Sequence, residues 1–176
     1  MDAPGSTAIV VLTPEAEPLA GGFYREHSNA GRDEMTLHVT LVVPFMPVDL
    51  LTEDIETRLR RLCSRREAFD YVLERFEYFE SGVLYLAPEP AGRFVDLVLA
   101  LTQEFPDFPP YEGMHAEVIP HVTIAESRDQ VLLSRIRSEV EPGLPIACRA
   151  GRATLVERGA DLRWRPRTAY AFGSLE

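Results

Sequence analysis

Alternation of hydrophobic and polar residues predicts β-strands along much of the chain. Successive side chains of a strand point to opposite faces, so a half-buried strand alternates and a fully buried strand is continuously apolar. Segments of both kinds recur from end to end, separated by turn-forming residues. The expected strands are residues 7–12, 35–45, 68–79, 83–87, 119–127, 145–150, 153–158 and 168–175.

Hydrophobic residues that recur at every third or fourth position predict amphipathic helices between these strands. The clearest pattern covers residues 49–66, and similar stripes cover residues 91–105 and 127–140. Ser127 and Gln130 have the spacing of a capping box, which would begin the last of these helices. A less regular helical pattern runs around Glu15–Glu26, whereas the prolines and glycine of PDFPPYEGMH predict a loop.

The chain repeats one motif in its two halves. MTLHVTLVVPF contains His38, IPHVTIAES contains His121, and an amphipathic helix follows each motif. This spacing indicates an internal duplication. We therefore expect an α+β fold in one bilobal domain over residues 1–176, with one motif in each lobe. The expected arrangement is two mixed or antiparallel sheets facing a central cleft, with helices outside and terminal strands able to cross between the lobes.

Composition places the chain among ordinary globular proteins and limits its partners. Its 176 residues are 45% hydrophobic and 26% charged, which is enough to bury a sizeable core. The net charge is −10, and all 18 basic residues are arginines. Binding of long duplex nucleic acid needs a basic face. We expect instead a small phosphorylated ligand or an RNA end, held in a locally positive cleft.

The remaining bulk features predict a cytoplasmic protein. No apolar segment approaches the roughly 20 residues that span a bilayer, and the N-terminus lacks the positive region of a signal peptide. We therefore expect no membrane association. Cys63 and Cys148 have no CxxC or other metal-ligand spacing, so we expect both to be reduced and structural.

The HVT triplets carry the candidate chemistry. Residues i and i+2 of a strand share a face, so His38 points with Thr40, and His121 points with Thr123. If a twofold axis relates the lobes, the two pairs face each other across the cleft. One imidazole can then accept a proton from water while the other protonates the departing oxygen of a phosphodiester. The threonine hydroxyls can bind the non-bridging phosphate oxygens.

Other interpretations have weaker support. A single histidine in an apolar strand is most often structural, but two of four histidines begin the same HVT triplet, which chance explains poorly. Zinc sites use three or four ligands, and the sequence has no HExxH motif or cysteine cluster. It also lacks the GxSxG motif of serine hydrolases and the glycine-rich loops that bind nucleotide phosphates.

With these motifs the chain resembles the two-histidine (2H) phosphoesterase superfamily, and within it bacterial proteins of the 2′-5′ RNA ligase family. LHVTLVVPF and FPPYEGMHAEVIPHVTIAE carry the resemblance, each with a complete HxTx motif, and it spans essentially the whole chain. It implies the duplicated two-lobe fold and a metal-independent phosphodiesterase that needs no cofactor. The implied substrates are 2′,3′-cyclic phosphates of RNA ends or small nucleotides, 2′-5′ linkages and cyclic phosphates derived from ADP-ribose.

The resemblance also implies roles for single residues. His38 and His121 would be the acid/base pair, and Thr40 and Thr123 the phosphate-binding hydroxyls. We favour His121 as base and His38 as acid for hydrolysis, although the pseudo-symmetry makes the reverse assignment nearly as good. An arginine is expected near the phosphate, but the sequence does not select one.

Two residues in the loop before the second motif are further candidates for substrate binding. Tyr111 could stack on a base, and the alternative is a packed loop anchor. His115 could lie at the same rim, and the alternative is a solvent-exposed side chain. We expect a monomer. The alternative function is a catalytically inactive module that binds an RNA end or a nucleotide in the same cleft.

Overall fold

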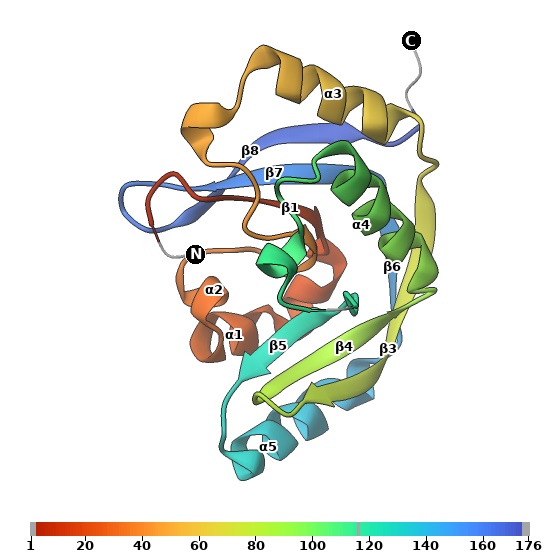
Figure 1. Cartoon of the computed structure of the whole chain (residues 1–176). Helices are drawn as coiled ribbons and strands as arrows, with labels where there is room; N and C mark the ends of the chain where they lie inside the picture. Colours follow the sequence, from red (N-terminus) through yellow and green to blue (C-terminus); the bar gives the residue numbers. More distant parts are fainter. Residues whose placement is uncertain (1–2, 116, 174–176) are drawn as a thin grey trace.

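The computed structural model describes residues 3–115 and 117–173. Its strands form one curled antiparallel sheet (Figure 1). In chain order they are β1 (Thr7–Leu12), β2 (His38–Val42), β3 (Phe69–Phe79), β4 (Val83–Glu89), β5 (Val122–Glu126), β6 (Ile146–Ala150), β7 (Arg152–Arg158) and β8 (Trp164–Ala171). Their order across the sheet is β6-β3-β4-β5-β2-β1-β7-β8. The α+β class expected from the sequence is confirmed.

The sheet consists of two halves that meet at a single residue pair. One half contains β2, β1, β7 and β8, and the other contains β6, β3, β4 and β5. They join where Val39 of β2 pairs with Val122 of β5, so the two sheets expected from the sequence are connected into one. β7 and β8 come from the C-terminal part of the chain but complete the half that contains His38.

The helices pack against both halves of the sheet. α1 (Glu17–His27) contacts β5 and α5 (Gln130–Val140), and the short α2 (Asn29–Arg32) follows it. α3 (Glu53–Ser64) contacts β8, and α4 (Gly92–Glu104) contacts β2. The sequence predicted helices outside the sheets, whereas Figure 1 shows α4 within the curve of the sheet.

Aromatic contacts explain the position of α4. Phe94 of this helix lies edge-on to Phe69 and Tyr71 of β3, with ring centroids 5.1 and 5.0 Å apart. Phe105, just after the helix, makes a similar contact with Phe45, just after β2. These rings belong to one continuous buried core, which fixes β2 relative to β3.

The start of α5 differs from the predicted capping box. Its N-cap is Asp129, whose Oδ1 accepts hydrogen bonds from the backbone N–H groups of Val131 (2.9 Å) and Leu132 (3.2 Å). The Ser127 hydroxyl instead accepts a hydrogen bond from the backbone N–H of Asp129 (3.0 Å). Aspartate and serine are comparable N-caps, so spacing alone did not distinguish them.

The two cysteines are free and buried, Cys63 in α3 and Cys148 in β6. Burial raises the pKa of each thiol to about 12. The thiolate is the nucleophilic form, so their environment supports the structural role that the sequence predicted.

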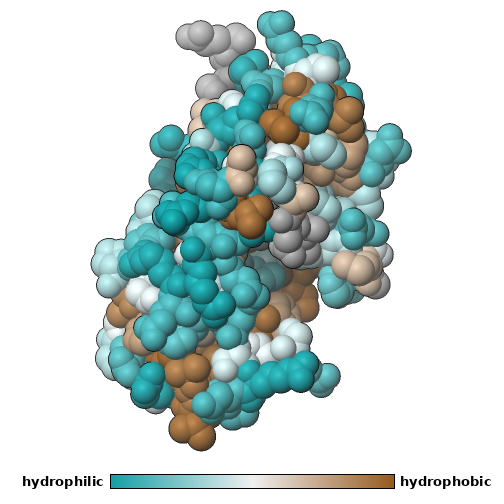
Figure 2. All heavy atoms as spheres, turned by 90° about the vertical axis from the view of Figure 1, so that its left-hand side faces the viewer, coloured by the Kyte–Doolittle hydropathy of each residue, from teal (hydrophilic) through white to brown (hydrophobic). Residues whose placement is uncertain are grey.

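The surface that carries α1, α2 and the end of the β7–β8 hairpin is mainly hydrophilic. Figure 2 shows hydrophobic side chains on this face in small, separate groups. In the part of the chain that the structure describes, no helix combines the length and apolar character needed to cross a membrane.

Candidate active site

The two HVT motifs lie side by side where the halves of the sheet meet. Val39 and Val122 are paired and buried. Continuing the antiparallel register by one residue in each direction places His38 opposite Thr123 and Thr40 opposite His121. Because alternate residues share a face, these four side chains point away from the valines to one side of the sheet. Each histidine therefore lies across from the threonine of the other motif.

Both imidazoles are oriented by a backbone carbonyl two residues earlier. Nδ1 of His38 lies 2.8 Å from the Thr36 oxygen, and Nδ1 of His121 lies 2.7 Å from the Ile119 oxygen. A carbonyl oxygen only accepts hydrogen bonds, so each Nδ1 donates and Nε2 carries the lone pair of the neutral ring. Nε2 is therefore the nitrogen available for proton transfer in both motifs.

Burial lowers the pKa of both histidines. The pKa of His38 falls to about 4, chiefly because burial disfavours the charged ring, and the nearby His121 contributes in the same direction. The pKa of His121 is also lowered by burial. Both rings are therefore neutral at pH 7. A phosphate anion bound between them would favour the protonated form of each ring.

The histidines and threonines line one cavity of about 330 Å³. Polar and aromatic side chains from other elements complete its wall, namely Tyr24, Ser28, Asn29, Asp33, Tyr111, Glu126 and Trp164. No arginine lines this cavity among the residues that the structure describes. The arginine expected near the phosphate is thus not among the residues of this wall, and that expectation stays a prediction.

Tyr111 enters the cavity from a short 3-10 segment, η3 (Pro110–Gly113). Its backbone N–H donates to the Val43 oxygen (2.6 Å). Burial raises the pKa of its hydroxyl, and the nearby Thr40 side chain partly offsets that rise. Tyr111 thus anchors the loop and lines the cavity. Because Tyr111 lies beside Thr40, it can affect how the Thr40 hydroxyl binds a ligand.

A second hollow of about 400 Å³ adjoins the cavity, because Tyr111 and His121 line both. Phe79 and His115 also line this hollow. His115 is exposed and lies edge-on to the Tyr111 ring, with centroids 5.3 Å apart. Both candidates from the loop are therefore at the rim of the site. The fourth histidine, His27, lies outside both hollows.

The sequence did not predict that Glu126 lines the cavity, and the strand pairing explains why. In a regular strand it would share a face with Val122, opposite His121. The pairing of β5 with β4 skips one residue, however: Thr123 pairs with Tyr85 and Ala125 with Leu84. The bulge at Ile124 reverses the alternation, so Glu126 lines the cavity with Thr123.

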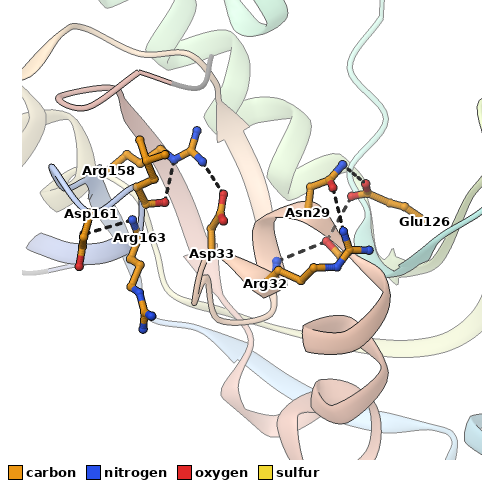
Figure 3. Close-up of polar contacts among 10 residues, drawn as sticks. Asn29, Arg32, Asp33, Glu126, Arg158, Asp161 and Arg163 are labelled. Carbon is orange, nitrogen blue, oxygen red and sulfur yellow. Dashed lines mark hydrogen bonds and ion pairs between the residues drawn. The ribbon is translucent and has the colours of Figure 1, made fainter.

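Polar contacts connect this wall of the cavity to neighbouring elements (Figure 3). The Asn29 amide donates to Glu126 Oε2 (3.0 Å) and accepts from Arg32 Nη1 (3.3 Å). Asp33, which also lines the cavity, pairs with the buried Arg158 of β7 at 2.5 Å. Within residues 3–115 and 117–173, no group of three or more His, Cys, Asp or Glu is placed to hold a metal ion.

Comparison with known proteins identifies the family. The sequence model of the 2′-5′ RNA ligase superfamily matches residues 12–162, a region that contains both HVT motifs and every residue of the cavity wall named above except Trp164. The chain belongs to the 2′-5′ RNA ligase superfamily. The resemblance based on the two HxTx motifs is thereby confirmed. A search of curated proteins found no match.

Solved structures show the same fold. Escherichia coli LigT in complex with 3′-AMP aligns with a TM-score of 0.60 and 19% identity, covering 98% of this chain and 100% of LigT. LigT in complex with NADP⁺ gives 0.60 and 16%, covering 97% and 99%. The protein TT0787 of Thermus thermophilus gives 0.65 and 18%, covering 97% and 100%. At these identities the likeness establishes the fold of this superfamily member and leaves its substrate open.

Proposed function

We propose that this protein is a phosphodiesterase that hydrolyses 2′,3′-cyclic phosphates or 2′-5′ phosphodiester bonds, in RNA ends or small nucleotides, without a metal ion. The observation that carries the proposal is the convergence of two neutral histidines, each with Nδ1 fixed by a carbonyl, on one cavity with two threonines. Family membership supports it. The nucleotide ligands bound to LigT are consistent with a nucleotide substrate here.

In the proposed reaction, one histidine removes a proton from a water molecule that attacks phosphorus. The bond from water to phosphorus forms, the bond from phosphorus to a ribose oxygen breaks, and the second histidine protonates that oxygen. The product is a ribose phosphomonoester, and exchange of one proton with solvent at each histidine restores the starting state. Thr40 and Thr123 donate hydrogen bonds to the non-bridging oxygens, where negative charge accumulates.

The low pKa of His38 favours this residue as the base. A ring whose pKa lies near 4 stays neutral when the phosphate binds, as the base must, and the role of acid then falls to His121. This assignment is the reverse of the one favoured from the sequence. Each role is worth roughly two to four orders of magnitude in rate.

Hydrolysis in EDTA tests the function. The substrates are the four nucleoside 2′,3′-cyclic phosphates, a 2′-5′ dinucleotide and ADP-ribose 1″,2″-cyclic phosphate. We expect turnover of at least one of them, with His38→Ala and His121→Ala each losing at least about a hundredfold in kcat, while the control His27→Ala retains wild-type activity. Binding of these compounds by a folded wild-type protein that never turns them over would instead establish the inactive binding module.

A substrate with a reactive leaving group separates acid from base. A p-nitrophenyl phosphodiester of a nucleoside needs no proton on the departing oxygen, because p-nitrophenolate is a stable anion. We expect His121→Ala to regain most of its activity on this compound and His38→Ala to stay inactive. The opposite pattern would restore His121 as the base.

A further inference from the structure

The cavity contains one carboxylate whose charge is not paired with a cation. Glu126 accepts hydrogen bonds from two neutral groups, the Ser28 hydroxyl at Oε1 (3.2 Å) and the Asn29 amide at Oε2 (3.0 Å). The Arg32 guanidinium donates to the Asn29 amide oxygen (3.3 Å) rather than to Glu126, as Figure 3 shows. In the part of the chain that the structure describes, no ion pair to Glu126 is formed.

The other carboxylate of the cavity is in a different electrostatic state. Asp33 pairs with Arg158 at 2.5 Å, and the Arg158 side chain is 7% exposed. The negative charge of Asp33 is therefore offset by a directly bonded guanidinium. No arginine lines the cavity among the described residues, and the chain has no lysine. Glu126 therefore adds a negative charge to this end of the cavity that no directly bonded cation offsets.

Resting on the proposed function, we propose that Glu126 selects substrates by charge. The scissile phosphate, with one negative charge, lies between the histidines and the threonines. Glu126 lies three residues along β5 from Thr123, a distance on the order of 10 Å. The group that extends from the scissile phosphate toward Glu126 is therefore an uncharged nucleoside, and a second phosphate on that side is excluded.

Two physical effects support this choice of ligand. Like charges within this distance repel, and they do so more strongly in a partly buried cavity than in water. The free lone pairs of the Glu126 carboxylate can in addition accept hydrogen bonds from ribose hydroxyls or from the amino groups of a base. The preferred substrate class is thus a nucleoside 2′,3′-cyclic phosphate or a 2′-5′ linkage whose nucleoside on this side has no further phosphate.

The test compares adenosine 2′,3′-cyclic phosphate with the same compound carrying a 5′-phosphate. For the wild-type protein we expect kcat/KM to be at least tenfold lower for the 5′-phosphorylated compound. Glu126→Gln keeps the size and shape of the side chain but replaces one acceptor oxygen with an NH₂ donor and removes the charge, and it should reduce the difference to less than threefold. The control Glu80→Gln makes the same change in charge at an exposed position outside the cavity. It should leave the ratio of the two kcat/KM values as it is in the wild-type protein.

A second measurement needs no variant. Raising the ionic strength from 0.05 to 0.5 M screens charge repulsion, so the wild-type ratio should fall several-fold. Equal ratios for wild-type protein and Glu126→Gln, or a wild-type ratio near one, would overturn the selection by charge.

Failure of the proposed function would be recognised separately, as wild-type protein that hydrolyses neither of these two compounds nor any compound of the panel given under the proposed function. In that case calorimetric binding of adenosine 2′-monophosphate and adenosine 2′,5′-bisphosphate decides the inference. Glu126→Gln should tighten binding of the bisphosphate about tenfold more than binding of the monophosphate. An equal change for both ligands would reject the role of Glu126 in the binding protein as well.

Discussion

At the scale of single residues, the two histidines are oriented by the backbone. Each Nδ1 donates to the carbonyl two positions earlier, so the HxTx motif and the path of the chain before it are sufficient to aim Nε2 at the cavity. Because a backbone carbonyl does not titrate, this orientation is maintained at any pH at which the strands are intact.

The lowered pKa of His38 predicts a specific dependence of stability on pH. An unfolded histidine takes up a proton near pH 6.5, whereas folded His38 does so only near pH 4. Between these values the unfolded state binds more protons, so stability falls as pH falls. From pH 7 to pH 5 the free energy of unfolding should decrease by about 2 kcal/mol more in wild-type protein than in His38→Asn. Urea denaturation at the two pH values measures the difference, and parallel losses would contradict it.

The residues of the cavity were predictable only where strand alternation is regular. The i, i+2 spacing placed His38 with Thr40 and His121 with Thr123, and the structure brings all four to one cavity. Glu126 was not predicted as a cavity residue because a bulge at Ile124 turns its side chain to the other face of the strand, and a bulge has no clear signal in IPHVTIAES. Asn29 and Trp164 belong to α2 and β8 rather than to the strands of the motifs, and they reach the cavity through tertiary structure.

At the scale of elements, one buried ion pair ties the segment after α2 to β7. Arg158 is 7% exposed and Asp33 34% exposed, and Arg158 also donates to the Leu162 oxygen at 2.9 Å. Removing Asp33 takes away a charge-assisted hydrogen bond that a buried guanidinium makes. We expect Asp33→Ala to lower the free energy of unfolding by about 2 kcal/mol, measured by chemical denaturation.

An exposed ion pair with a similar distance between nitrogen and oxygen provides the control. Arg149 and Asp70 lie 2.6 Å apart, with side chains 60% and 77% exposed. Asp70→Ala should change the free energy of unfolding by less than about 1 kcal/mol, because solvent screens such pairs. If the two variants lose equal stability, burial is not what gives the Asp33 pair its strength.

Helices and strands were easier to predict than their packing. Amphipathic spacing located α3, α4 and α5, but the position of α4 inside the curve of the sheet depends on the rings of Phe94, Phe69 and Tyr71, which come from separate elements. The same pattern of buried residues would fit a helix on either side of a sheet. Local periodicity indicates which face of a helix is buried, but it does not identify the element that packs against that face.

At the scale of the whole molecule, the two halves of the sheet cannot be separated by cutting the chain once. β1 and β2 from the N-terminal part form one half of the sheet together with β7 and β8 from the C-terminal part, and β1 pairs with β7, while β3 to β6 lie between them in sequence. Only Gly151 separates β6, in one half, from β7, in the other. The duplication in the sequence is therefore interleaved in the fold, and the cavity forms where the two halves meet.

This interleaving predicts that the protein unfolds in one cooperative step. Trp164, the only tryptophan, lies in β8 and lines the cavity, so its fluorescence reports the half of the sheet that contains His38. Far-UV circular dichroism reports the strands and helices of both halves. Since one buried core runs through the molecule, the two signals should give coincident urea transitions with the same midpoint. A fluorescence transition that precedes the loss of circular dichroism would show that the halves unfold separately, and the cavity would then be lost before the fold.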